Sequence, residues 1–145
     1  MPQVVKALTL AQPWAALVTS GAKRVETRSW RTRYRGLLAI HAARGFPVPA
    51  QRLCTVPPFS DHLRAAGTWP PEALPRGCVV ATCRLAACER ITRLTLPPEP
   101  ERSFGNYADG RWAWLLEDVR PLAGPLPAKG ALGLWEWDEG EGPPP

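Results

Sequence analysis

The chain has 145 residues, 45% of them hydrophobic, and this length and composition suit one domain with a buried core. No apolar run reaches the roughly 18 residues that a membrane helix needs, and the N-terminus lacks the regions of a signal peptide, so we expect a cytoplasmic protein without membrane partners. The net charge is +5 although acidic residues crowd the C-terminus, so the rest of the chain is more basic than this total. A basic body favours either a phosphate-bearing partner or a merely solvated surface, and charge alone leaves both open.

The first part of the chain predicts three strands and one helix. Alternating apolar residues and β-branched side chains favour strands over residues 4–10, 25–30 and 36–43. Pro13 stands in the first turn of the expected helix, where proline is favoured. We expect Gly21 to end this helix, because glycine is common just beyond a helix C-terminus.

The remainder of the chain predicts further strands separated by proline-rich connections. Residues 47–58 contain four prolines and predict a loop, after which Ser60 is expected to cap a short helix ending near Gly67. Strands are expected over 78–92, which would be long and bent, over 111–119 and over 130–137, with a loop over 96–109. We assign residues 1–138 to a single domain and 139–145 to a flexible tail. Five or six strands without regular strand–helix alternation predict an α+β fold, a small and partly closed barrel with flanking helices.

Four cysteines are present, and we expect them to be free thiols that behave as small buried hydrophobes. Cys78, Cys83 and Cys88 have a spacing that zinc ligands can adopt. On one regular strand, however, Cys83 would face away from the other two, because side chains alternate between the faces of a sheet. The sequence therefore predicts neither a metal site nor a cofactor.

The segment from Gly21 to Arg35 combines basic and aromatic side chains. Its members that could contact a nucleic acid are Arg24, Arg28, Arg31 and Arg33, with Trp30 and Tyr34 among them. Basic groups neutralise phosphates while flat rings stack on unpaired bases, a mixture that suits single-stranded nucleic acid. The alternative is an exposed hairpin whose arginines are solvated and whose aromatic rings pack on the core.

Lys23 follows directly after the expected helix end, and its role depends on its surroundings. A lysine becomes a base or nucleophile only when burial or nearby cations lower its pKa. Arg24 and Arg28 could lower the pKa of Lys23, whereas Glu26 could raise it by pairing with the ammonium group. The sequence leaves this balance open.

Several motifs in order along the chain resemble the ASCH domain. They are Ala7-Leu8-Thr9-Leu10-Ala11-Gln12-Pro13-Trp14-Ala15, Gly21-Ala22-Lys23-Arg24-Val25-Glu26-Thr27-Arg28, Tyr34-Arg35-Gly36, Ala39-Ile40-His41-Ala42-Ala43, Gly105 with Tyr107 and Gly110-Arg111, and Leu134-Trp135-Glu136-Trp137. The resemblance implies a PUA-like mixed β pseudo-barrel with a cleft beside the first helix, and work related to RNA. Some members resemble binding modules or coactivator domains, others are amidohydrolases acting on acylated cytidine, and ribonuclease activity also occurs in the family.

The amidohydrolase branch uses a lysine, a threonine three residues later and a distant glutamate. Lys23 matches the lysine, but Glu26 occupies the threonine position and Thr27 stands one residue further on. This departure from the pattern bears against the amidohydrolase mechanism. If the chain is a hydrolase, the resemblance implies Lys23, Glu26 and Glu101 as its candidate catalytic residues, with Glu99 as an alternative for the distant acid.

We expect the other site residues to bind RNA or a nucleoside, and each has an alternative structural role. The full set of candidate binding residues is Gln12, Trp14, Arg24, Arg28, Trp30, Arg31, Arg33, Tyr34, His41, Tyr107 and Arg111. Gln12 and Trp14 could form the floor of the cleft, or cap the helix and join the core; His41 could be a base or a hydrogen-bonded core histidine. Arg111 could bind a ligand anion or pair with Glu117 or Asp118.

Three functions therefore follow from the sequence. The leading hypothesis is binding of RNA or a modified nucleoside in a cleft formed by the first helix and the segment from Lys23 to Arg28. The second is a hydrolase acting on acylcytidine or RNA through Lys23 and a carboxylate. The third is a protein-interaction domain in a regulatory complex, which the seven tryptophans keep open. The sequence leaves the oligomeric state open.

Overall fold

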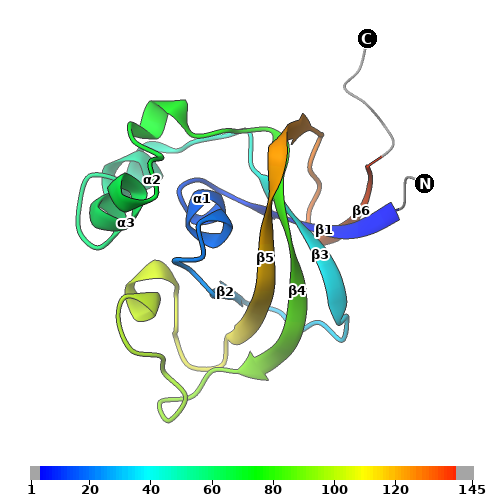
Figure 1. Cartoon of the computed structure of the whole chain (residues 1–145). Helices are drawn as coiled ribbons and strands as arrows, with labels where there is room; N and C mark the ends of the chain where they lie inside the picture. The colour runs from blue at the N-terminus through cyan, green and yellow to red at the C-terminus, as the bar shows by residue number, and fades with distance from the viewer. Residues whose placement is uncertain (1–3, 140–145) are drawn as a thin grey trace.

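A computed structural model describes residues 4–139 and shows a six-stranded sheet with helices on its concave side (Figure 1). The strands are β1 (Val4–Leu10), β2 (Val25–Arg28), β3 (Gly36–Ala42), β4 (Cys78–Arg90), β5 (Trp112–Pro127) and β6 (Leu134–Asp138). The helices are α1 (Trp14–Thr19), α2 (Val48–Leu53) and α3 (Phe59–Ala65), with short 3₁₀ turns η1 (Pro71–Ala73) and η2 (Glu101–Phe104). The predicted tail lies, apart from Glu139, outside the described residues.

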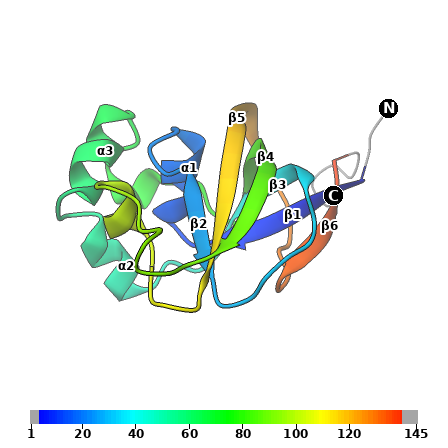
Figure 2. The ribbon, with the colours of Figure 1, turned by 90° about the horizontal axis from the view of Figure 1, so that it is seen from below.

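The sheet has the strand order β2-β5-β4-β3-β1-β6 and is mixed. β1 and β3 are parallel, whereas the pairs β1–β6, β2–β5, β3–β4 and β4–β5 are antiparallel. The chain crosses from β1 to β3 through α1 and β2, and the sheet curls around α1 (Figure 2). The predicted α+β pseudo-barrel with flanking helices is confirmed.

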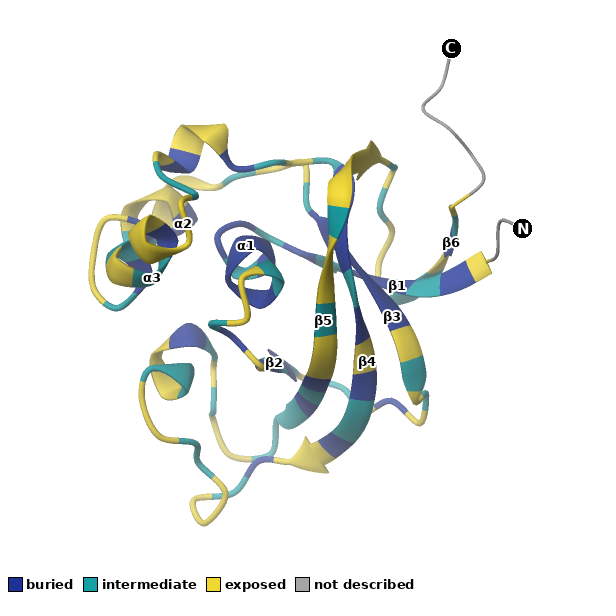
Figure 3. Cartoon of the chain, viewed as in Figure 1, coloured by how far each residue is buried: buried dark blue, intermediate teal, exposed yellow. Residues whose placement is uncertain are grey.

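Helix α1 fills the space inside the curled sheet. Its residues Ala15, Ala16, Leu17 and Val18 are all buried, because one side of the helix packs on the sheet and the other on the α2–α3 region (Figure 3). A helix this short is marginal alone, so burial on both sides is what stabilises it. This arrangement fixes the segment that follows α1 and carries the candidate site.

The predicted orientation of the cysteines is wrong. Cys78, Cys83 and Cys88 all belong to the main core cluster rather than to opposite faces of the sheet. The pairing register of β4 shifts between Val79 and Ala81 and again between Leu85 and Ala87, and an irregularity of this kind breaks the alternation of side chains. Among residues 4–139, no group of three or more His, Cys, Asp or Glu side chains could hold a metal ion.

We expect the folded protein to show no readily reactive thiol. All four cysteines are buried, and burial raises the pKa of Cys54 and Cys78 and raises that of Cys83 to about 12. The thiolate is the reactive species, so labelling by an aromatic disulfide reagent near pH 8 should be slow until the protein is unfolded in guanidinium. Rapid modification of one thiol in the native state would contradict this placement.

Three elements differ from the predictions. The expected loop over 47–58 contains α2, because proline at the first helical positions is compatible with a helix. Helix α3 begins at Phe59 without a side-chain cap, so Ser60 is its second residue and not its N-cap. Strand β5 extends to Pro127 instead of ending near Val119.

Within the described part of the chain, every helix is too short or too polar to span a bilayer.

Candidate functional site

The site begins where α1 ends. Gly21 has a φ of 85°, a left-handed conformation that glycine adopts without steric cost. The Lys23 N–H donates a hydrogen bond to the carbonyl of Leu17 at 3.0 Å, which folds the chain back onto the helix before β2 starts at Val25. Lys23 therefore belongs to the turn and not to the strand, and its side chain lies on the same side as that of Glu26.

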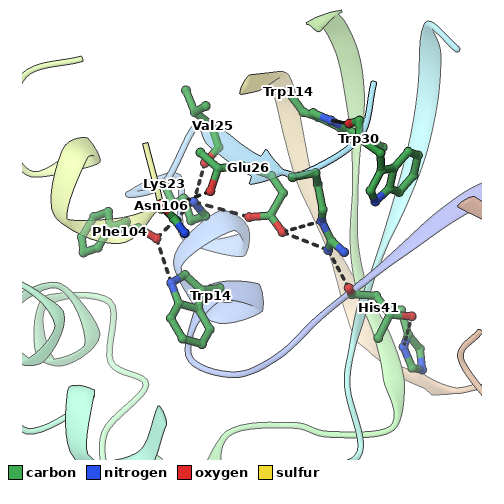
Figure 4. A network of polar contacts seen from close by, with 12 residues as sticks. Trp14, Lys23, Val25, Glu26, Trp30, His41, Phe104, Asn106 and Trp114 are labelled. Atoms are coloured by element: carbon green, nitrogen blue, oxygen red, sulfur yellow. Dashed lines mark hydrogen bonds and ion pairs between the residues drawn. The ribbon is translucent and has the colours of Figure 1, made fainter. Parts of the chain in front are cut away.

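Lys23 is fully buried and surrounded by oxygen atoms (Figure 4). Its Nζ donates to the carbonyls of Val25 and, at 3.4 Å, Phe104, and lies 3.6 Å from Oε1 of Glu26. Burial lowers the pKa of Lys23, and the carboxylates of Glu26 and Glu101 oppose that shift. These carbonyl and carboxylate contacts are the compensation that a buried ammonium group requires.

Glu26 joins Lys23 to Arg28. Its Oε2 lies 2.9 Å from Nη2 of Arg28, which also donates a hydrogen bond to the carbonyl of Thr9 at 2.8 Å (Figure 4). The side chain of Glu26 is only 12% exposed and that of Arg28 24%. The two groups are thus held in fixed positions between β2 and the end of β1, with limited access to solvent.

Glu26 and Arg28 line a cleft of about 510 Å³. The polar lining comes from Thr9, Glu26, Thr27, Arg28, Ser103 and Asn106, and the apolar lining from Leu10, Ala11, Trp14, Leu53, Phe59 and Phe104, with Gly105 between. The indole N–H of Trp14 donates to the carbonyl of Phe104 at 2.8 Å, and its ring packs edge-on against Phe59. Lys23 does not line this cleft, but it contacts Glu26, which does.

Glu101 and Tyr107 lie behind this cluster. Oε1 of Glu101 accepts the backbone N–H of Arg24 at 2.6 Å, while its Oε2 and the Tyr107 hydroxyl are buried without a hydrogen-bond partner in the described structure. Burial raises the pKa of Glu101 and of Tyr107, and the carboxylates of Glu101 and Glu26 raise the latter further. Buried polar atoms usually have hydrogen-bond partners, so two such atoms close to a buried lysine are unusual.

The structure uses four of the predicted binding residues to hold the fold. Gln12 is buried, accepts the N–H of Ala16 and donates to the carbonyl of Pro75, so it fixes the start of α1 and lies outside the cleft. Trp30 packs edge-to-face against Trp114, and the Tyr34 hydroxyl donates to the carbonyl of Leu37. His41 is buried, with its ring nitrogens on Thr9 and Ala128.

Of the predicted arginines, only Arg28 lines the cleft. Arg24, Arg31 and Arg33 are exposed, and none of them lines the cleft. Arg31 lies over the ring of Trp112 instead. Arg111 donates to the carbonyls of Asn106 and Thr27, so it secures the loop beside the cleft and does not pair with Glu117, whose partner is Arg84.

Sequence reasoning missed part of the cleft. The lining residues outside the predicted set of site residues are Thr9, Leu10, Ala11, Thr27, Leu53, Phe59, Ser103, Phe104, Gly105 and Asn106. One signal was present, because Asn106 is the only asparagine of the chain and follows a glycine. Gly105 allows a close approach: a Cβ there would lie 2.9 Å from Tyr107 and 3.1 Å from Thr27.

The curled mixed sheet, the helix inside it and the cleft beside that helix are consistent with the α+β pseudo-barrel of a PUA-like domain. A family model for the ASCH domain matches residues 8–123, and the chain belongs to this family. ASCH domains are associated with RNA binding.

Two curated relatives are similar to nearly the whole chain. They are activating signal cointegrator 1 of Mus musculus and of Homo sapiens, each 29% identical over 131 residues. The match covers 90% of this chain but 22% of each relative, so the chain spans about a fifth of their length.

Proposed function

We propose that this domain binds RNA and receives one unpaired nucleotide in the cleft between α1 and β2. A volume of about 510 Å³ lies within the range of small-molecule sites, which is roughly 300–1,000 Å³. RNA is read mainly through unstacked bases that lie against rings and bond through their edges. The cleft offers both kinds of contact.

The two linings of the cleft have complementary chemistry. Trp14 and Phe59 supply ring surface for a base, on the side of α1 and α3. On the side of β2, Glu26 accepts hydrogen bonds from amino or imino groups of a base, and Asn106 has a side-chain amide that both donates and accepts. Arg28 adds a positive charge that can bind a phosphate or a base carbonyl.

The position of Glu26 is the observation that carries this proposal. A carboxylate that contacts a buried lysine through one oxygen and an arginine through the other is fixed in orientation, and such preorganisation limits the entropy lost on binding. Its accepting oxygens therefore suit a ligand with N–H donors, such as the exocyclic amine of cytidine or adenosine.

A hydrolase is the second candidate function. The lowered pKa of Lys23 and the raised pKa of Glu101 are the properties that a base and an acid need near neutral pH. Access argues for binding instead, because Lys23 is fully buried, its Nζ is surrounded by three oxygen atoms, and its side chain does not line the cleft.

Substituting Arg28 tests the proposal. Arg28→Gln should weaken binding of a fluorescently labelled single-stranded RNA by about tenfold, or ~1.4 kcal/mol, as measured by anisotropy at fixed salt. Arg93→Gln is the matched control, since it removes the same charge from an exposed residue outside the cleft and should change the affinity little. Thermal unfolding of both variants verifies that they fold.

Two results would contradict RNA binding in this cleft. One is equal affinity of the Arg28 and Arg93 variants, which would leave only nonspecific charge attraction. The other is the absence of RNA affinity in the wild-type domain, which would favour a protein-interaction role like the one that the relatives' name, cointegrator, suggests. Electrophoresis of the same RNA after incubation would reveal cleavage, and loss of cleavage in Lys23→Met would support the hydrolase.

A further inference from the structure

A second and larger cleft, of about 930 Å³, lies on the other side of the C-terminal end of β1. Its floor contains Thr9 and the buried His41, and the segment after β5 forms one wall through Lys129 and Gly130. The proposed nucleotide cleft and this second cleft share Thr9 as a lining residue, so they are neighbours along β1.

The second cleft is positively charged. Arg44, Arg76 and Lys129 line it with exposed side chains, and no acidic residue belongs to its described lining. Arg76 donates to the carbonyl of Arg44 at 3.4 Å and lies near the ring of Phe46, contacts that keep its guanidinium at the rim. Three cations around a hollow without a carboxylate raise the local concentration of anions, because nothing in the lining neutralises them.

The floor of this cleft is a connected set of hydrogen bonds. Thr9 Oγ1 lies 3.1 Å from Nδ1 of His41 and accepts the indole N–H of Trp135 at 3.0 Å. The backbone carbonyl of the same Thr9 accepts a hydrogen bond from Nη2 of Arg28, which lines the nucleotide cleft. One residue thus anchors the polar groups of both clefts.

Gly130 lets its segment of backbone lie close against Thr9 and His41. A Cβ at this position would lie 2.7 Å from Cε1 of His41 and 2.8 Å from Oγ1 of Thr9, distances that real side chains do not tolerate. The backbone of the segment that carries Lys129 can therefore approach the floor closely, which brings that cation to the same hollow as Arg44 and Arg76.

We propose that the second cleft binds phosphate groups of the RNA strand whose base occupies the nucleotide cleft. This inference rests on the proposed function, and it adds a direction: the strand runs across the end of β1, from Arg28 towards Arg76 and Lys129. Such a groove of cations beside a base-binding cleft is the arrangement by which proteins hold single strands. The cations recognise phosphate and not a particular base.

The test is a double substitution with two RNA lengths. Arg76→Gln combined with Lys129→Gln should weaken binding of a 12-nucleotide RNA by at least tenfold and leave a trinucleotide nearly unaffected. The slope of log affinity against log salt should fall by about 1.4, since each lost phosphate contact on a single strand contributes about 0.7. Arg93→Gln combined with Arg120→Gln removes the same charge outside both clefts. This control should change the affinity for the 12-nucleotide RNA and the salt slope much less.

The outcomes separate this inference from the proposed function. If Arg28→Gln weakens binding while the Arg76/Lys129 variant behaves like the control pair, the second cleft has no role and the nucleotide cleft stands. If only the Arg76/Lys129 variant loses affinity, the nucleotide cleft fails, and with it the proposed path of the strand from Arg28, while phosphate binding in the second cleft stands. Inorganic tripolyphosphate is the remaining probe. If it binds the wild-type domain as tightly as the 12-nucleotide RNA does, and the Arg76/Lys129 variant loses this affinity, the ligand of the second cleft is a free polyphosphate. The proposal that this cleft binds an RNA strand is then overturned.

Discussion

Replacing Lys23 with methionine should lower the free energy of unfolding by about 2–4 kcal/mol, as measured by urea denaturation. The substitution removes the donor to two buried carbonyls, of Val25 and Phe104, and one of the two cationic partners of Glu26. Methionine fills a similar volume, so the cost comes from unsatisfied polar groups and not from a cavity. The lowered pKa of Lys23 limits the loss, because a neutral side chain avoids the desolvation of the ammonium group.

A matched control is available in Lys6→Met. Lys6 pairs with Glu136 at 3.4 Å, but their side chains are 39% and 67% exposed, and such solvent-accessible pairs contribute at most about 1 kcal/mol. The stability of this variant should stay within that amount of the wild type. A Lys23 variant as stable as the Lys6 variant would show that the carbonyls around Nζ are satisfied without it.

Gly105→Ala should destabilise the domain by about 1–3 kcal/mol and weaken RNA binding as well. The new methyl group would lie 2.9 Å from Cε2 of Tyr107 and 3.1 Å from Cγ2 of Thr27. Thr27 is buried, and its hydroxyl accepts the backbone N–H of Asn106 at 3.0 Å. Relief of the clash therefore displaces the loop through which Asn106 lines the cleft.

Gly124→Ala is the corresponding control on β5. Nothing lies within 4 Å of a Cβ at Gly124 and its φ is outside the left-handed region, so this change should be neutral or stabilise the domain by up to about 1 kcal/mol through the unfolded chain. RNA affinity should be unchanged. Equal stability and affinity of the two alanine variants would mean that the loop after η2 absorbs the methyl group without moving the cleft.

Local patterns predicted the parts of the fold that depend on local preference. Strand β1 and strand β3 show alternation or apolar content strong enough to place them within a residue of their observed ends. Helix α2 was missed because prolines mark both loops and first helical turns, and only the burial of Ala50 and the packing of Leu53 against the core cluster of α1 and α3 distinguish the two.

Local sequence patterns predicted the candidate site best where its residues are close in sequence. Lys23, Glu26 and Arg28 form one motif, and a single turn brings them together. Phe59 and Asn106 reach the same cleft from segments far along the chain, and their positions follow from how α3 and η2 pack around α1. Trp30 and Tyr34 misled because an aromatic ring beside arginines has the same composition whether it faces a ligand or the core.

The pairing of β1 with β6 brings the two ends of the described chain together. Val4 is aligned with Asp138 across these antiparallel strands, so the polypeptide enters and leaves the domain at one place (Figure 1). A unit with adjacent entry and exit points can be inserted into a surface loop of a host protein without pushing that loop's ends apart. The same geometry makes the domain a good subject for circular permutation. A short linker would join its present ends, and new chain termini would be opened in the exposed turn between β4 and η2.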